Sequence, residues 1–373
     1  MGFQHEPLSL YVRRRRDIVS RSVSIFRGWN YHDIEVPLLD YVEPDTDAQG
    51  PRTFQIVDRE GNAMALRSDG TPAIAKLYAR HLHRWPAPLR VCYANRIVRS
   101  ERALGREQTE SYQLGVEMLG SNGVLSDLEV ILICLETLEA IGVRDHQLNL
   151  SSSAIYHHLL RKTGLPAIKR DAINAAVRVR DPYEVRQILH RCGTRHNIAQ
   201  ALEAVASLWG GERQLRVISQ ELPNDRTLAG AIKHLERLVQ ILGELGYGEH
   251  LNIDLGDLPD QDYYTGTVFS VVSEGVGRRL GGGGRYDDLC SRFGVAAPAA
   301  GFALRLDALI ATLQASASLA PLSSPVSVVR VDPEDPVPGL KELLSHRRAN
   351  QNTRLIVGNG RPPMPGASGK ESP

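Results

Sequence analysis

Four consecutive glycines, Gly281–Gly284, stand directly before Arg285 in this sequence. Glycine has no Cβ, so such a run permits backbone geometries that side chains forbid and lets a ligand approach the chain closely. The sequence has no GxxxxGKS/T pattern, and no GxGxxG between a strand and a helix, which argues against a P-loop or a Rossmann dinucleotide site. Nothing in it resembles a GxSxG or cysteine nucleophile motif. The glycine run alone therefore assigns no chemistry.

Two histidine pairs are the remaining candidates for a metal site. His81 and His83 are one residue apart, and His157 and His158 are adjacent. Neither pair has an acidic or thiol residue at the spacing that a zinc ligand set requires. We therefore expect ordinary surface or core histidines, and neither a metal ion nor another cofactor.

The composition is that of a globular chain with almost no net charge. Of the 373 residues, 42% are apolar and 23% are charged, which excludes a disordered or collagen-like polymer and allows a sizeable core. The 44 basic and 43 acidic residues nearly cancel, so no global basic field attracts nucleic acid or an anionic membrane. The length allows one large domain with attachments or two to three ordinary domains.

Membrane and secretion signals are not expected. The longest strongly apolar stretch, Val130–Leu135, is far shorter than the roughly 20 residues of a membrane span. Met1–Leu10 is polar where a secretory signal needs an apolar core. The four cysteines lie far apart with no CxxC pair, which predicts reduced thiols and a cytoplasmic protein.

The residue patterns predict β strands on both sides of a block of helices. Residues 153–247 are predicted to be helical throughout, with Asp181-Pro182 as a helix start and an apolar stripe from Leu228 to Leu242. Such a block between β-rich stretches indicates an insertion into a sheet domain. The other predicted elements are a helix at 11–26 with Arg13–Arg16 on a solvated face, a hairpin of 53–57 and 63–67, a buried helix at 130–138, and strands at 265–272 and from 278.

The C-terminal part differs in composition. Residues 314–325 are mostly Ala, Ser, Leu and Pro and are predicted to be a linker. A strand at 326–331, a helix at 339–348 and a strand at 353–357 predict a small β-α-β module within residues 326–358. Residues 359–373 are rich in Gly, Pro and Ser and are predicted to be disordered.

Several short stretches gain meaning when they are taken together. They are Gly28–Pro37, Leu66–Thr71, Val98–Arg102 with Gly105-Arg106, Tyr112–Glu117, Asp262–Phe269, Gly282–Asp287 and Gly301–Leu304. In order and spacing they are similar to motifs 1, 2 and 3 and the histidine signatures of histidyl-tRNA synthetases, which are class II aminoacyl-tRNA synthetases. The resemblance covers about residues 26–313. It implies an α+β domain over residues 1–313, with a mostly antiparallel sheet flanked by helices and a dimer interface near Pro37.

The resemblance also implies a site for free histidine. Asp69, Thr71 and Gln113 match the family positions that take the α-amino group. Glu117 and Tyr264 match those that hold the imidazole, with Tyr263 alongside. Carboxylates and hydroxyls accept hydrogen bonds from an ammonium, and a glutamate accepts one from an imidazole N–H. The alternative for Glu117 and Asp69 is an ordinary buried ion pair with Arg285 or Arg67.

The departures from the family concern the arginines that hold ATP. Pro259 and Ala308 stand where the resemblance implies catalytic arginines, and Thr109 stands at a third such place. Each lost donor to a developing negative charge typically costs about 10²–10³ in rate. We therefore expect no amino-acid activation. The remaining candidate phosphate or anion contacts are Arg99 and Arg285; in the alternative, a neighbouring arginine compensates for the losses, namely Arg99, Arg106 or Arg305.

This combination resembles the histidyl-tRNA synthetase paralogues that serve as regulatory subunits of ATP phosphoribosyltransferase. The resemblance implies assembly with the short catalytic subunit, typically as a hetero-octamer, and feedback inhibition by histidine in the first step of histidine biosynthesis. It implies no binding of tRNA, because the C-terminal module is much shorter than an anticodon-binding domain. Two alternatives stay open. One is a divergent histidine–tRNA ligase or stand-alone amino-acid-activating ligase, and the other is a structural subunit with an empty pocket.

Overall fold

The computed structural model describes residues 8–42, 53–98, 102–103, 106–107, 110–259, 261–273, 277–315, 327–332, 334–335, 337–349 and 353–357. The chain divides into two compact units, Met1–Leu319 and Ala320–Pro373. Each unit is described by itself below. The described residues include no helix long and apolar enough to cross a membrane.

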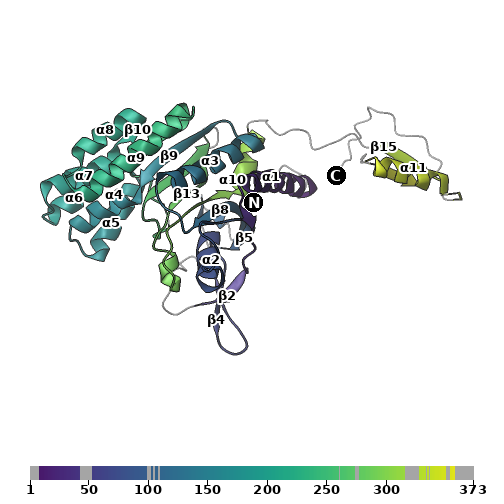
Figure 1. Cartoon of the computed structure of the whole chain (residues 1–373), viewed down its shortest axis with the longest axis horizontal. Helices are drawn as coiled ribbons and strands as arrows, with labels where there is room; N and C mark the ends of the chain where they lie inside the picture. Colours follow the sequence, from purple (N-terminus) through teal and green to yellow (C-terminus); the bar gives the residue numbers. More distant parts are fainter. Residues whose placement is uncertain are drawn as a thin grey trace. The chain divides into compact units, whose positions relative to one another are not determined.

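A nine-stranded sheet forms the centre of the first unit (Figure 1). β1 pairs with β5, and β9 with β11, in parallel; all other neighbours in this sheet are antiparallel. This confirms the expected mostly antiparallel sheet. The strands, in spatial order, are β1 (His32–Asp33), β5 (Leu89–Val98), β8 (Glu110–Leu119), β14 (Ala299–Arg305), β13 (Arg278–Arg285), β12 (Thr267–Ser273), β9 (His146–Ser152), β11 (Leu251–Asp254) and β10 (Trp209–Gly210).

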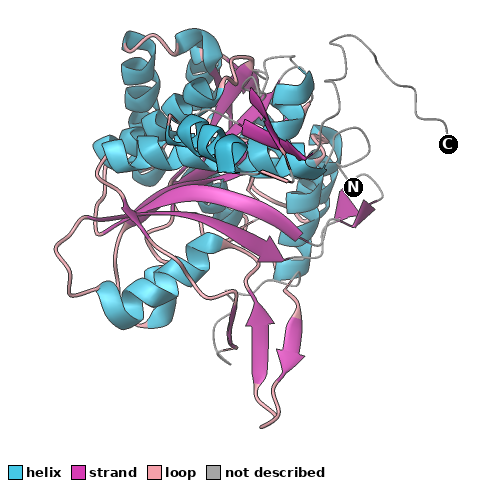
Figure 2. Ribbon diagram, turned by 90° about the vertical axis from the view of Figure 1, so that its right-hand side faces the viewer, coloured by secondary structure: helices cyan, strands magenta, loops and turns pink. Residues whose placement is uncertain are grey.

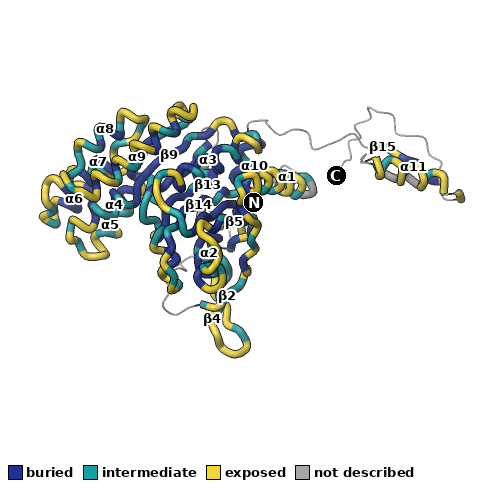
Figure 3. The backbone as a smooth tube through the Cα atoms, viewed as in Figure 1, coloured by how far each residue is buried: buried dark blue, intermediate teal, exposed yellow. Residues whose placement is uncertain are grey.

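The two faces of the sheet are covered by different helices. Alternation along β8 separates them, because Val116 and Met118 belong to one core cluster while Glu117 points to the other face. Figure 3 shows the buried residues concentrated along the central strands and α3. The first face carries α1 (Leu8–Gly28), α3 (Val124–Ile141) and α10 (Leu306–Ala315), and the second carries α2 (Gly70–Leu77), the π-helical turn η1 (Tyr78–Leu82) and η3 (Cys290–Phe293).

The predicted helical insertion connects two parallel neighbours of the sheet, β9 and β11. Asp181 caps a helix that begins at Pro182, and the apolar stripe from Leu228 to Leu242 is buried, as the sequence predicts. The region is not helical throughout, because β10 pairs with β11 at the sheet edge. The helices are α4 (Ser153–Lys162), α5 (Ala167–Arg178), α6 (Pro182–Arg191), α7 (His196–Ser207), α8 (Glu212–Glu221) and α9 (Arg226–Glu244), followed by η2 (Gly248–His250).

A small three-stranded sheet projects from the first unit (Figure 2). It contains the predicted hairpin, whose turn is closed by the Asp58 carboxylate accepting from the backbone N–H groups of Glu60 and Asn62. Its strands, in spatial order, are β2 (Leu39–Tyr41), β4 (Ala63–Leu66) and β3 (Gln55–Val57). A second, very short hairpin pairs β6 (Arg102–Ala103) with β7 (Arg106–Glu107).

The second unit has the β-α-β order expected from the sequence. β15 (Ser327–Val331) and β16 (Thr353–Val357) are parallel, and α11 (Val337–Arg348) connects them. Most of the predicted linker, and the predicted disordered tail at 359–373, lie outside the described residues.

The α9 stripe yields a stability prediction. Leu235 is 1% exposed, so Leu235→Ala should lower the free energy of unfolding by about 2–5 kcal/mol through lost burial and a cavity. The matched control is Leu245→Ala at the end of the same helix, where the side chain is 54% exposed and the loss should stay near 0.5 kcal/mol. Urea unfolding of both variants measures the difference, and equal losses would contradict the assignment of the buried face.

Candidate functional site

Four of the predicted histidine-site residues come from α2 and β8. Asp69 is the N-cap of α2 and accepts from the backbone N–H of Thr71 at 3.4 Å. Gln113 and Glu117 are four residues apart on β8, so strand alternation places both on the face that α2 covers. The fold therefore brings residues nearly 50 positions apart in the sequence to one side of the sheet.

Glu117 is a fully buried carboxylate held by hydroxyl groups. Thr71 Oγ1 donates to its Oε1 at 2.5 Å, the Tyr93 hydroxyl donates to the same oxygen at 3.4 Å, and the Tyr286 hydroxyl donates to Oε2. Burial raises the pKa of Glu117 to about 8, although the three hydroxyl donors oppose that rise; the nearby charge of Asp69 adds to it. Among the described residues, no Lys, Arg or His forms an ion pair with Glu117.

Asp69 and Gln113 form the neighbouring part of the site. Gln113 Nε2 donates to Asp69 Oδ1 at 3.3 Å, and Gln113 Oε1 accepts from the backbone N–H of Gly70 at 3.0 Å. The Tyr263 hydroxyl donates to Asp69 Oδ2 at 3.1 Å. Asp69 is partly exposed, whereas Gln113 is buried. A carboxylate beside an amide oxygen, at the edge of solvent, suits a cationic ammonium group.

An aromatic cluster closes the site on the side of β12 and β13. The ring centroids of Tyr263 and Tyr264 are 4.8 Å apart, and Tyr286 meets Tyr263 edge-to-face at 5.7 Å. The structure thus brings all six predicted residues together. Sequence reasoning missed the contacts of Tyr93 and Tyr286 with Glu117. Tyr286 stands in the glycine-rich motif that carried the resemblance, whereas Tyr93 gave no signal beyond its place in an apolar strand.

Glycines supply the space that the site requires. A Cβ on Gly301 would lie 1.7 Å from Oε2 of Glu117, and a Cβ on Gly70 would lie 2.5 Å from the Tyr93 ring. Either side chain would displace a site residue. In the run Gly281–Gly284 the close approach is made by the backbone of neighbouring strands, because a Cβ at Gly283 would lie 2.1 Å from the Gly301 carbonyl oxygen; the approach of a ligand to this run stays a prediction.

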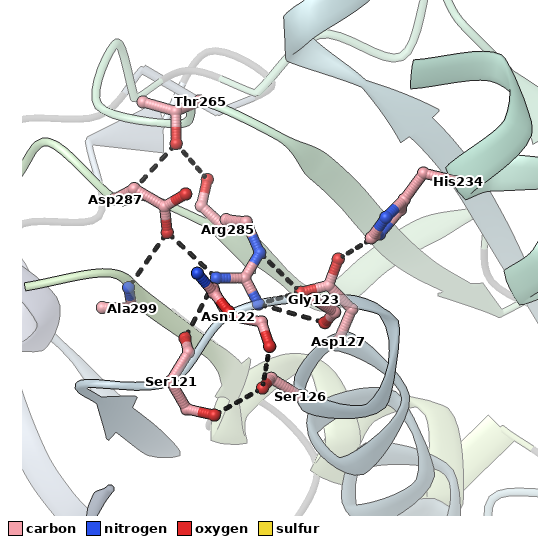
Figure 4. A network of polar contacts seen from close by, with 10 residues as sticks. All are labelled: Ser121, Asn122, Gly123, Ser126, Asp127, His234, Thr265, Arg285, Asp287 and Ala299. Carbon is pink, nitrogen blue, oxygen red and sulfur yellow. Dashed lines mark hydrogen bonds and ion pairs between the residues drawn. The ribbon is translucent and has the colours of Figure 1, made fainter. Parts of the chain in front are cut away.

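Arg285 lies on the opposite face, where it anchors α3 (Figure 4). Its Nε and Nη2 donate to Asp127 at 2.8 and 2.5 Å, and Nη1 donates to Asp287 at 2.9 Å. The carbonyls of Ser121 and Gly123 accept from Nη1 and Nη2. All five guanidinium N–H groups are therefore committed within the protein. This contradicts the expectation that Arg285 contacts a phosphate or another anion.

The structure also contradicts the alternative in which Glu117 and Asp69 form ion pairs with Arg285 or Arg67. Arg67 donates to the backbone carbonyls of Val36, Pro37 and Arg96. Because Arg285 serves Asp127, neither arginine neutralises Glu117 or Asp69.

The structure describes two of the three positions that lack an expected arginine, Pro259 and Ala308. Pro259 leads towards the aromatic cluster, and its carbonyl accepts from Arg178 Nη2 at 2.9 Å. Ala308 is buried in α10. The candidate contact Arg99 and the position of Thr109 lie outside the described residues. In the part of the chain that is described, no group of three or more His, Cys, Asp or Glu side chains could hold a metal ion.

This sheet, with paired carboxylates and tyrosines on one face, defines a class II aminoacyl-tRNA synthetase-like protein. The family model for histidyl-tRNA synthetase matches residues 5–309. A curated relative from Moorella thermoacetica, named ATP phosphoribosyltransferase regulatory subunit, is 34% identical over 79% of this chain and 77% of its own. One of the same name from Geobacter sulfurreducens is 31% identical over 78% and 67%. The chain belongs to the histidyl-tRNA synthetase family, in its branch of ATP phosphoribosyltransferase regulatory subunits.

Solved structures agree on the fold. A protein from Bacillus halodurans, titled ATP phosphoribosyltransferase regulatory subunit/histidyl-tRNA synthetase, superposes with a TM-score of 0.83 at 24% identity, covering 97% of this chain and 95% of that one. A histidine–tRNA ligase subunit from Alicyclobacillus acidocaldarius gives a TM-score of 0.71 at 28% identity, covering 85% and 97%.

The raised pKa of Glu117 predicts a pH-dependent stability. Between pH 4.5 and about 8, the folded chain keeps a proton on Glu117 that the unfolded chain has lost. The stabilisation is thus complete below pH 4.5, and the free energy of unfolding should fall with a slope approaching about 1.4 kcal/mol per pH unit until about pH 8.

Urea unfolding at several pH values measures this slope with and without the ionisable group. Glu117→Gln should remove this contribution. Glu110→Gln, an exposed position on the same strand, should leave it in place. A slope that Glu117→Gln does not change would contradict a proton bound at Glu117.

Proposed function

We propose that this chain is a non-catalytic regulatory subunit of ATP phosphoribosyltransferase that binds free histidine and conveys feedback inhibition. The observation that carries the proposal is the site itself. Asp69, Gln113 and Glu117 offer acceptors for an ammonium and an imidazole, while Pro259 and Ala308 offer no cation for a triphosphate. The names of the curated relatives support the same function.

The proposed mechanism is thermodynamic linkage. If histidine binds one arrangement of the assembly better than another, it shifts the equilibrium of the catalytic partner, typically by about 1–3 kcal/mol of coupling free energy. The partner is the short catalytic subunit, in a hetero-octamer, and this chain self-associates as a dimer through the region of Pro37. No tRNA binding is part of the proposal. The free thiols of all four cysteines suit the cytoplasm.

Feedback inhibition gives the direct test. In the complex reconstituted with the short catalytic subunit, Glu117→Ala should raise the histidine concentration for half-inhibition by at least tenfold, because the imidazole loses its buried acceptor. The basal activity of the complex and its mass should not change, which shows that the variant still assembles. Inhibition that stays unchanged in such an assembled complex would refute a histidine site at Glu117.

An assay of amino-acid activation separates this function from a ligase. Histidine-dependent exchange of pyrophosphate into ATP should stay at background, since Pro259 and Ala308 occupy two positions where catalytic arginines are expected. A histidyl-tRNA synthetase assayed in parallel provides the positive control. Exchange above background would support the ligase instead. Calorimetry without heat of binding up to millimolar histidine would support a structural subunit with an empty site.

A further inference from the structure

A β-bulge directs one arginine of β13 to the face that carries the site. Val271 of β12 pairs with Gly281, but Val272 pairs with Arg279, so Leu280 is the extra residue. Bulges re-aim the side chains beside them. Leu280 is fully buried in the core cluster that includes α3. Arg279 therefore emerges on the other face, the face of the tyrosines.

Arg279 is oriented by the carboxylate of Asp257. Its Nη2 forms an ion pair with Oδ1 of Asp257, whose Oδ2 accepts from the Ser270 hydroxyl on the adjacent strand. The Arg279 side chain is 36% exposed, while Asp257 is 17% exposed. Of the five guanidinium N–H groups, only one has a partner among the described residues. Within the described part of the chain, the fork is thus bound at one end and has no partner at the other.

The positive charge of Arg279 acts on the site. Burial raises the pKa of Tyr264, the charges of Asp69 and Glu117 add to that rise, and the charge of Arg279 is one of the smaller effects that oppose it. Tyr264 packs on Tyr263, and Tyr263 donates to Asp69. The charges of Arg279 and Asp69 both act on Tyr264, so a cation and the carboxylate proposed for the ammonium lie near the same tyrosine pair.

We propose that Arg279 binds the carboxylate of the zwitterionic ligand, in the role that Pro259 cannot fill. The inference deepens the proposed function and depends on it, because it assumes histidine in this site. An arginine matches a carboxylate with two parallel N–H donors, and the ion pair with Asp257 holds the guanidinium in place for that contact. The ligand would then be recognised at three points: ammonium at Asp69, imidazole at Glu117 and carboxylate at Arg279.

Two ligands that differ only in the carboxylate test this assignment. Histidinamide keeps the ammonium and imidazole of histidine but carries a neutral amide. For Arg279→Met in the full chain, calorimetry should show an affinity for histidine reduced by about 10- to 100-fold and an affinity for histidinamide changed by less than about twofold. Arg279→Lys should recover part of the histidine affinity, because it restores the charge without the fork. Arg216→Met on exposed α8 is the matched control and should change neither affinity.

Each other result has one meaning. An equal loss of affinity for both ligands would make Arg279 a structural residue and overturn the assignment. Unchanged histidine affinity in Arg279→Met would overturn it as well, while the proposed function would stand. If the unsubstituted chain binds neither ligand, the proposed function and this assignment both fall. A thermal unfolding curve for each variant confirms that the comparison is made between folded proteins.

Discussion

The site depends on a carboxylate that is removed from water without a positive charge beside it. Burying an ionised carboxylate in this way is costly, and proteins compensate with hydrogen bonds, a partner charge or a bound proton. Around Glu117 the compensation comes from the hydroxyls of Thr71, Tyr93 and Tyr286, and from a raised pKa. These three donors belong to α2, to β5 and to the segment after β13. The site therefore exists only when the sheet and α2 are assembled around it.

Strand β13 also carries the contact that holds α3 on the opposite face of the sheet. Arg285 and Tyr286 are adjacent, so strand alternation sends one side chain to α3 and the other to Glu117. Asp127 receives Arg285 and also accepts from His234 Nε2 of α9 at 2.8 Å. One aspartate thus joins the central strand, helix α3 and the helical insertion. A buried arginine committed in this way has a structural role, and breaking such a pair typically costs about 3–5 kcal/mol.

Sequence alone predicted the elements with strong local signals. The N-cap at Asp181, the α9 stripe and the β3–β4 hairpin follow from local residue patterns that tertiary packing reinforces. Short elements escaped prediction. Helix α2 has only eight residues, too few for a clear period, although Asp69 provides its cap. β10 has two residues and exists only because β11 offers an edge to pair with.

The site was predictable as a set of residues and not as a network. The order and spacing of the motifs brought the six residues together, because a family resemblance encodes contacts that local patterns do not. The resemblance could not show that Arg285 has a structural role, because its partner Asp127 belongs to α3, on the face of the sheet opposite the site. Nor could it identify Tyr93, because the role of this residue comes from its contact with Glu117 on the neighbouring strand and not from a local pattern. Arg279 was hidden for a related reason, since regular alternation around Leu280 fails at the bulge.

A site with acceptors for an amino acid, and with Pro259 and Ala308 where arginines are expected, suits the proposed regulatory function. Activation of an amino acid depends on groups that bind the transition state better than the substrate, and arginines aimed at the phosphates provide that difference. Regulation needs a different quantity, the difference in ligand affinity between two arrangements of an assembly. A buried Glu117 whose proton, hydroxyl partners and ligand compete for the same two oxygens can supply such a difference. The free energy of this carboxyl group depends on the positions of α2, β5 and β13, so in the proposed function a small movement among these elements would change the affinity for histidine.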